Sequence, residues 1–302
     1  MTVSESGSPR PHASGLGVRD LGLALIMNIA WGFNIIAIKE TVEQVPVGLA
    51  AAIRMAIVGL LLLPWLRLVP GRMWQLAWVG LVSGALFMIV INTSLKMATN
   101  ISALAITSQL GAPFGLILGI LFLGERIHWP RIMGCVLALA GVGVIGFDPA
   151  MFGEIPAMAL SAFAALLWAI GALVLRSLKG VSVLTIYAWI GVISAPTLFA
   201  YALLTESHTA ASIASVPAAA LGWLAFSAIG STLIGQGGMA WLLQRHPVSL
   251  VVPLTLGSPL IAVVASALFY SIDVTVAMVI GGLMTLGGVA IITIRGARKA
   301  HA

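Results

Sequence analysis

The chain has 302 residues, of which 60% are hydrophobic and only 8% are charged, and its formal net charge is +6. A soluble domain of this length could not bury so much apolar surface, so the composition excludes an ordinary soluble protein. The basic residues are spread over many short connections, which argues against nucleic acid as a partner. Cys135 is the single cysteine, so neither an intrachain disulfide nor a cysteine metal site can form.

Ten apolar segments are long enough to cross a bilayer as helices, which takes about 20 residues each. Residues 1–19 are rich in Ser, Gly and Pro and lack the apolar core of a cleavable signal, so we expect a flexible cytoplasmic tail there. Residues 295–302 are expected to form a second cytoplasmic tail. The expected spans, in chain order, are 20–39, 47–66, 74–95, 101–123, 130–147, 156–175, 181–204, 219–243, 248–271 and 274–294.

The Lys and Arg residues fall at alternate ends of these spans. Twelve of the 15 lie on the side that holds both termini, only Lys39 and Lys96 lie on the other side, and Arg54 lies inside a span. Short loops rich in Lys and Arg remain in the cytoplasm. The pattern predicts an all-α membrane protein with ten transmembrane helices and cytoplasmic N- and C-termini.

The sequence also repeats itself. The motif Leu-Gly-Ala-Pro at 110–113 recurs as Leu-Gly-Ser-Pro at 256–259, and Trp31 is matched by Trp168. Because five helices is an odd number, the second half must enter the membrane from the opposite side. Inverted repeats are typical of secondary transporters, although a duplication kept only for packing is the alternative. The repeats are predicted to cover residues 20–147 and 156–294.

Several short motifs occur in an order that is typical of one family. They are Ala-Trp-Gly-Phe-Asn at 30–34 followed by Lys39, Arg54 in the second span, Pro113, and Gly-Glu-Arg-Ile at 124–127 before a Gly-rich fifth span. With these motifs the chain resembles the EamA family of the drug/metabolite transporter superfamily over nearly its whole length beyond the N-terminal tail. One departure lies at residues 270–273, which read Tyr-Ser-Ile-Asp where the family often repeats the Gly-Glu motif.

The resemblance implies a multi-pass protein of the bacterial inner membrane that exports amino acids or related small metabolites. Amino-acid exporters of the YddG type are the nearest functional analogy. The family resemblance further implies a central cavity that opens alternately to each side of the membrane. The implied partners are a small-molecule substrate and the lipid bilayer, with no cofactor or metal; the oligomeric state stays open, and a monomer is compatible with the sequence.

Charged residues are the first candidates for a site, because ionisable groups in a membrane are costly unless they are used or paired. For Arg54 we favour a structural role, either reaching the membrane surface or pairing with Glu40 or Glu43, over the alternative of substrate contact. Lys39 and Lys96 each end a span on the outer side, where they could attract an anionic group or simply be solvated.

Uncharged polar and aromatic residues are the remaining candidates for substrate contact. A neutral set of amides, hydroxyls and indoles suits a zwitterion or a small neutral metabolite, although each residue could instead join helices. The cavity candidates are Asn28, Trp31, Asn34, Asn92, Ser108, Gln109, Trp168, Gln236 and Ser258.

Glycines and prolines inside the spans predict packing and helix breaks. Gly111, Gly115 and Gly119 recur every four residues, a pattern typical of close helix contact. Pro113 and Pro259 are expected to loosen their helices.

The spans hold no Asp, Glu or His well inside, and such residues usually form proton relays. We therefore expect downhill export without obligate proton coupling, and no ATP-binding loop is present. Exporters of hydrophobic drugs or nucleoside-like metabolites are the alternative within transport. A channel or an intramembrane enzyme is less well supported, because no charged ring and no acid, base or metal set stands out.

Overall fold

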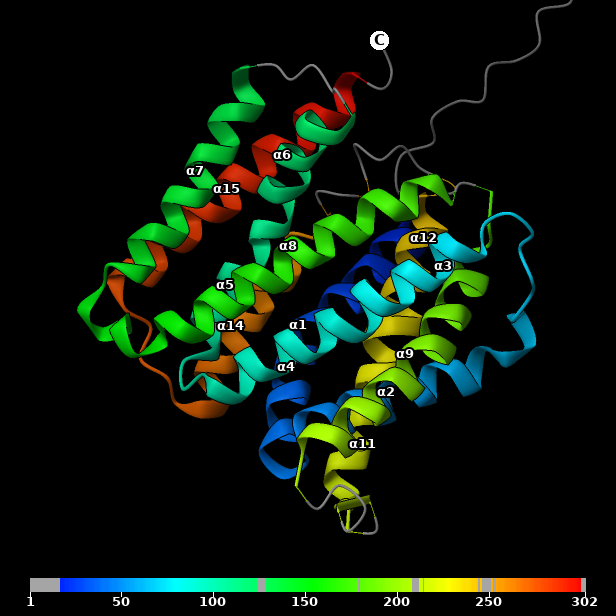
Figure 1. Cartoon of the computed structure of the whole chain (residues 1–302). Coiled ribbons are helices and arrows are strands. Elements are labelled where there is room, and N and C mark those ends of the chain that lie inside the picture. Colours follow the sequence, from blue (N-terminus) through cyan, green and yellow to red (C-terminus); the bar gives the residue numbers. More distant parts are fainter. Residues whose placement is uncertain are drawn as a thin grey trace, which may run out of the picture.

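The computed structural model describes residues 17–123, 129–178, 180–207, 212–213, 215–243, 245, 251 and 254–299. All regular structure in these residues is helical (Figure 1). The elements are α1 (Val18–Gln44), α2 (Val47–Leu62), η1 (Leu63–Trp65), α3 (Met73–Val79), η2 (Gly80–Leu86), α4 (Phe87–Met97), α5 (Ile101–Thr107), η3 (Ser108–Leu110), α6 (Gly111–Leu123), α7 (Trp129–Gly146), η4 (Pro149–Glu154), α8 (Ile155–Ser177), α9 (Val183–Thr205), α11 (Ala218–Phe226), η5 (Ser227–Gln236), α12 (Gly237–Leu243), α14 (Gly257–Tyr270) and α15 (Val276–Lys299).

Eight helical stretches are long and apolar enough to cross a membrane, and they follow the first eight expected spans closely. Two shorter apolar helices, Gly257–Tyr270 and Val276–Ile292, lie where the last two spans are expected. The beginning of the expected span 248–271 lies largely outside the described residues, as do residues 1–16 of the expected N-terminal tail. Within the expected C-terminal tail, α15 continues as helix to Lys299, and the cytoplasmic position of this segment stays a prediction.

The helices pair in a pattern that relates the two halves of the chain. Helix α7 packs along α15 and α2 packs along α9, so the fifth and tenth spans and the second and seventh spans are partners (Figure 1). Helix α1 packs against α14 and η5, and α8 packs in the same way against α6 and α4. The pairings therefore follow the repeat. If every helix is replaced by the corresponding helix of the other half, the same set of helix pairs results.

Pairs of glycines bring the backbones of two pairs of helices close together. A Cβ atom added to Gly191 of α9 would lie 2.6 Å from the Cα of Gly59 in α2, and one added to Gly134 of α7 would lie 2.8 Å from the carbonyl oxygen of Gly288 in α15. Small residues of this kind let membrane helices approach without a side chain between them.

The glycines expected to pack span four closely are placed differently. A Cβ atom added to Gly115 would meet nothing within 4 Å, and one added to Gly111 would meet only ordinary contacts beside Trp168. Gly119 is buried in α6. The sequence pattern is therefore wrong about Gly115, and the tight glycine contacts lie in α2–α9 and α7–α15 instead.

Four helical stretches change their backbone geometry at matching places in the two halves. The π-helical segments η2 and η5 interrupt the third and eighth spans. A 3-10 turn, η3, separates α5 from α6 shortly before Pro113, and α14 begins two residues before Pro259. Proline has no N–H to donate to the carbonyl four residues earlier, so a break is expected at each proline.

Candidate functional site

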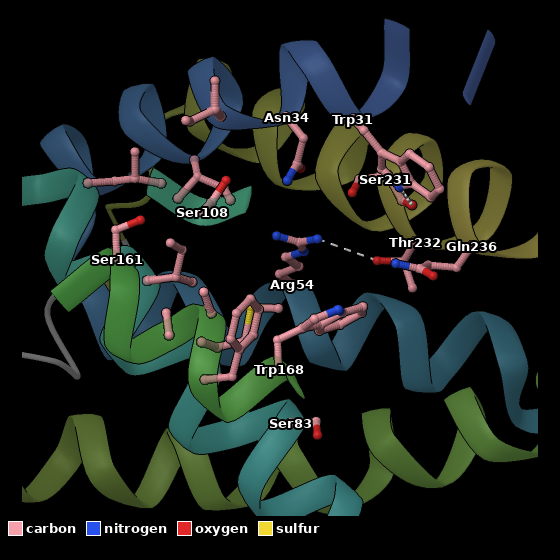
Figure 2. Close-up of a pocket in the computed structure, with 18 of the residues that line it drawn as sticks. Trp31, Asn34, Arg54, Ser83, Ser108, Ser161, Trp168, Ser231, Thr232 and Gln236 are labelled. Carbon is pink, nitrogen blue, oxygen red and sulfur yellow. Dashed lines mark hydrogen bonds between the residues drawn. The ribbon is translucent and has the colours of Figure 1, made fainter. Parts of the chain in front are cut away.

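A cavity of about 320 Å³ lies between the two halves (Figure 2). Its lining comes from α1, α2, α4, α5, α8, α9, α14 and the segments η2, η3 and η5. Ligand pockets for small molecules usually measure about 300–1,000 Å³, so this cavity suits a small metabolite. Its walls are mainly apolar, with polar side chains at a few positions.

The irregular helix segments converge on this cavity. Ser83 of η2, Thr232 of η5, Gln109 of η3 and Pro259 at the start of α14 all line it. Non-helical backbone at membrane depth is tolerated where it lines a cavity or is buried, and discontinuous helices form the substrate sites of many secondary transporters. Inserted π-turns are likewise frequent at functional sites.

Most of the cavity candidates inferred from the sequence lie together in this lining. These residues come from five different spans, and Figure 2 shows how several of them face the same space. They are Trp31, Asn34, Ser108, Gln109, Trp168, Gln236 and Ser258.

Two of the candidates lie elsewhere. The side-chain amide of Asn28 donates to the carbonyl oxygens of Ala24 at 2.7 Å and Leu254 at 2.8 Å, so it joins α1 to the segment before α14. The amide of Asn92 approaches the carbonyl oxygen of Val47 at 3.5 Å, between α4 and the start of α2. Neither residue lines the cavity. Both side chains serve the alternative use, which is to connect helices.

The two repeat-related tryptophans contribute differently to the walls. The indole N–H of Trp31 donates to the carbonyl oxygen of Ser231 at 3.1 Å, which fixes its ring against η5. Trp168 packs against Phe87 with ring centroids 5.7 Å apart, yet 39% of its surface remains accessible. An aromatic ring held in this way offers a ligand a rigid apolar surface.

Arg54 also lines the cavity, although we expected a structural role for it. Its side chain reaches from α2 toward η5, where Nη2 lies 3.5 Å from the hydroxyl oxygen of Thr232 (Figure 2). The expected partners are engaged elsewhere in the described structure. Glu43 pairs with Lys39 at 2.5 Å, and Glu40 accepts a hydrogen bond from the Tyr270 hydroxyl at 2.7 Å.

Several hydroxyl residues of the lining were not found by sequence reasoning. Ser83, Ser161, Ser231 and Thr232 face the cavity, but small hydroxyl residues are common in membrane helices and do not stand out individually. One signal was present in the repeat. Gly84 of η2 and Ser231 of η5 both line the cavity. Their separation along the sequence is close to the separation of the two proline motifs.

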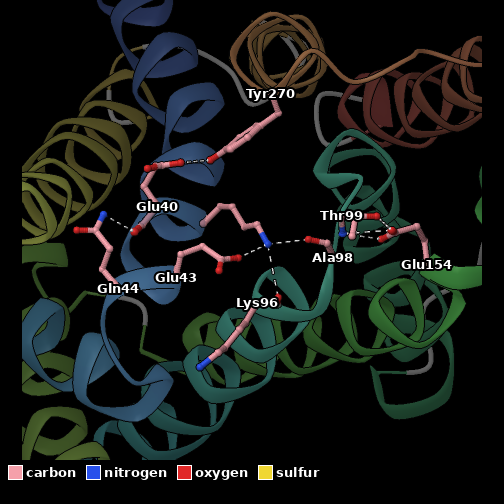
Figure 3. Close-up of polar contacts among 9 residues, drawn as sticks. Glu40, Glu43, Gln44, Lys96, Ala98, Thr99, Glu154 and Tyr270 are labelled. Atoms are coloured by element: carbon pink, nitrogen blue, oxygen red, sulfur yellow. Dashed lines mark hydrogen bonds and ion pairs between the residues drawn. The ribbon is translucent and has the colours of Figure 1, made fainter. Parts of the chain in front are cut away.

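The expected outer-side lysines differ from each other. The ammonium of Lys39 donates to the carbonyl oxygen of Ala98 at 2.7 Å, besides its ion pair with Glu43 (Figure 3). Lys96 is exposed and its side chain points away from these contacts (Figure 3). Neither lysine lines the cavity.

A group of polar contacts surrounds Lys39, and we call it the Lys39 cluster. It consists of Lys39, Glu40, Glu43, Ala98, Thr99, Glu154 and Tyr270 (Figure 3). One of its contacts joins the two halves of the chain, and another joins the first half to the connection that follows it. Tyr270 of α14 bonds to Glu40 of α1, and the backbone N–H of Thr99 donates to the buried Glu154 at 3.1 Å. Ile38 lines the cavity, so the cluster adjoins its end.

The family can now be assigned. The EamA-like transporter family matches the chain twice, over residues 20–147 and 155–294. The chain belongs to the EamA-like transporter family. The described part of this EamA-family protein has eight apolar helices of spanning length, and with its relatives they make it a multi-pass protein of the bacterial inner membrane. The family also indicates a transporter rather than an enzyme.

Two curated proteins resemble the EamA-family chain over most of its length. A probable amino-acid metabolite efflux pump of Escherichia coli is 27% identical over 289 residues, which cover 91% of this chain and 93% of that protein. A protein of the same description from Salmonella typhimurium is 24% identical over 284 residues, 90% of this chain and 94% of that protein.

A protein of known crystal structure shares the fold. It superimposes on the EamA-family chain with a TM-score of 0.61 over 94% of this chain and 99% of its own, at 19% sequence identity. At this identity the likeness concerns the fold alone.

Proposed function

We propose that the protein exports amino acids or related small metabolites across the inner membrane through the cavity between its halves. The observation that carries the proposal is the convergence of four irregular helix segments on one cavity of metabolite size. Curated relatives described as probable amino-acid metabolite efflux pumps support the substrate class and the direction.

The proposed topology has ten transmembrane helices in two inverted repeats of five, with both termini in the cytoplasm. Eight candidate spans and two shorter apolar helices at the expected positions support the count. The Lys and Arg distribution supports the orientation, because 12 of the 15 basic residues lie on one side.

Alternating access is the proposed mechanism. The Lys39 cluster joins α1 to α14 and Thr99 to Glu154, so it holds the halves together at the proposed outer end of the cavity. Opening toward the outside requires these contacts to separate. The α2–α9 and α7–α15 contacts, which rest on glycine, provide smooth surfaces for helices that rock against each other.

Export is proposed to run downhill without obligate proton coupling. The described residues that line the cavity include no Asp, Glu or His to carry a proton. Proteoliposome flux measured with the substrate gradient held constant checks this point. Flux that stops when an imposed pH gradient is collapsed would contradict it.

The apolar lining and the two tryptophans favour a substrate with an apolar portion, and a hydrophobic drug or nucleoside-like compound is the second candidate. A flux screen in proteoliposomes with mixed amino acids, their derivatives and nucleosides separates the two. Saturation of the flux with rising substrate concentration distinguishes a carrier from a channel.

Site variants test whether the cavity is the route. Asn34→Ala and Gln236→Ala are expected to lower flux at least severalfold, because each removes an amide from the cavity wall. Gln44→Ala is the matched control, since it removes an exposed amide at the end of α1 outside the cavity. Unchanged transport of every substrate in both site variants would refute the assignment.

A further inference from the structure

Arg54 combines deep burial with an incompletely satisfied side chain. Only 6% of its surface is accessible, and Nε has no hydrogen-bond partner in the described structure. Its contact with the neutral Thr232 hydroxyl is long, at 3.5 Å. A guanidinium presents five donors, and it stays charged under all physiological conditions. The guanidinium lines the cavity and has no carboxylate within ion-pair distance among the described residues.

The charge of the cavity is unbalanced. Arg54 is the only Lys, Arg, Asp or Glu among the described residues that line it. A buried charge is costly unless an opposite charge and hydrogen bonds compensate it. The nearest carboxylates along α1 are held by Tyr270 and Lys39 in the Lys39 cluster. No carboxylate among the described residues therefore balances the charge of Arg54, and an anionic ligand in the cavity would balance it.

The surroundings of Arg54 define the shape of the missing group. Asn34 lies across the cavity from the guanidinium, and its side-chain amide belongs to the cavity lining (Figure 2). Trp168 and Met55 form apolar walls of the same space. The site therefore offers a cationic fork, a neutral amide and an apolar surface.

We propose that Arg54 binds the carboxylate of the exported metabolite and selects small organic monoanions with an apolar body. The inference rests on the proposed export function and deepens it. The planar fork of the guanidinium matches a carboxylate bidentately, and the Asn34 amide can hydrogen-bond a neutral polar group of the same molecule.

The single positive charge of the cavity also sets the order in which classes of substrate are expected to bind. A monoanion neutralises the single positive charge of the cavity, whereas an amine would place a second positive charge beside Arg54. A free amino acid carries both charges and falls between the two. A phosphate ester would bring about two negative charges to one guanidinium and leave the cavity with an excess. The substrate class is therefore an amino-acid derivative with its amine blocked, or a related carboxylic acid.

The test uses matched probes on the purified full-length protein. N-acetyl-leucine and its uncharged amide differ only at the carboxylate, and their dissociation constants are compared by titration in detergent. The wild-type protein is expected to bind the acid about tenfold to a hundredfold more tightly, as expected for a hydrogen bond to a charged group. Leucine is expected between the two, and isoamylamine is expected to bind most weakly.

Variants at Arg54 separate recognition from folding. Arg54→Gln is expected to abolish the preference for the acid while binding of the amide changes by less than about threefold. Arg54→Lys is expected to retain part of the preference, because it keeps the charge but loses the bidentate fork. Gln44→Ala is again the control. Retention of the full acid preference in Arg54→Gln overturns the inference.

Charge movement provides a measurement that needs no variant. In proteoliposomes, transport of N-acetyl-leucine is expected to respond to a membrane potential imposed with K⁺ and valinomycin, because the substrate moves as an anion.

Wild-type transport that shows no preference between acid and amide overturns the role of Arg54 and leaves the proposed function intact. Tighter binding of phenyl phosphate than of benzoate would also overturn it. Absence of saturable flux for any metabolite refutes the proposed function itself.

Discussion

At the scale of single residues, the polar side chains in the membrane divide by what they face. Asn34 and Arg54 line the cavity, whereas Asn28 lies outside it and donates its side-chain N–H groups to two backbone carbonyl oxygens. Residue type alone does not separate these uses, because an amide in a membrane helix is needed equally for ligand binding and for joining helices. Each group therefore has a different expected phenotype when it is removed.

Asn28→Ala is expected to lower stability without changing ligand affinity. The substitution leaves the part-buried carbonyl oxygen of Leu254 without its donor, which costs about 1 kcal/mol. Thermal unfolding of the purified protein measures the loss, and Gln44→Ala should leave the melting temperature almost unchanged because its amide is exposed. A variant that kept its melting temperature but bound N-acetyl-leucine more weakly would place Asn28 in the site instead.

At the scale of helices, backbone geometry and glycine contacts decide where the cavity forms. The long apolar segments predict the helices well, because burial of about 20 apolar residues across a bilayer leaves little freedom in length. Pro113 and Pro259 also predict the two breaks near the cavity. The π-helical segments η2 and η5 were not predicted, since no proline marks them and they depend on packing between helices.

The candidate site was predictable only in part for the same reason. Trp31 and Trp168 were found because they are large and occupy matching positions in the repeat. The direction of Arg54 depends on how α2 is rotated against its neighbours, and helical spacing along one span does not fix that rotation. Nothing in the sequence distinguishes Ser231 and Thr232 from other hydroxyl residues. They belong to the cavity lining because of the geometry of η5.

Gly191→Ala is expected to destabilise the protein through the α2–α9 contact. The new methyl group would lie 2.6 Å from the backbone of Gly59, so the helices must separate, at a cost of about 1–3 kcal/mol. Gly115→Ala is the matched control in α6, where a methyl group meets nothing within 4 Å. The control should be neutral or slightly stabilising, because alanine favours a helix over glycine by roughly 0.5–1 kcal/mol. Equal melting temperatures for the two variants would contradict this assignment of the close contact.

At the scale of the whole molecule, the two halves enclose the cavity and are joined beside it by the Lys39 cluster. The bond from Tyr270 to Glu40 connects α14 with α1, so it crosses between the halves next to the cavity residue Ile38. In a carrier that alternates between two states, such a bond stabilises the state in which this end is closed. Its loss shifts the population toward the state in which this end is open.

Tyr270→Phe tests this coupling, because it removes one hydroxyl and keeps the ring. Loss of a hydrogen bond worth about 0.5–1.5 kcal/mol shifts the equilibrium roughly twofold to tenfold toward the outer-open state. The shift can be measured with Ser161→Cys, a cavity position, in a Cys135→Ala background, as the labelling rate by an impermeant thiol reagent added outside intact cells. The Tyr270→Phe substitution should raise that rate, and Gln44→Ala should not.

The direction of the change is the decisive part of the result. If the contact closes the outer side, Tyr270→Phe should give faster labelling from outside and slower labelling from the cytoplasmic side in inverted vesicles. The two rates change in opposite directions because the outer-open population grows at the expense of the inner-open one. Faster labelling from both sides would indicate general loosening of the fold, and the melting temperature would fall with it. Faster labelling from the cytoplasmic side alone would reverse the proposed orientation of the protein in the membrane, since the Lys39 end of the cavity would then be the inner one.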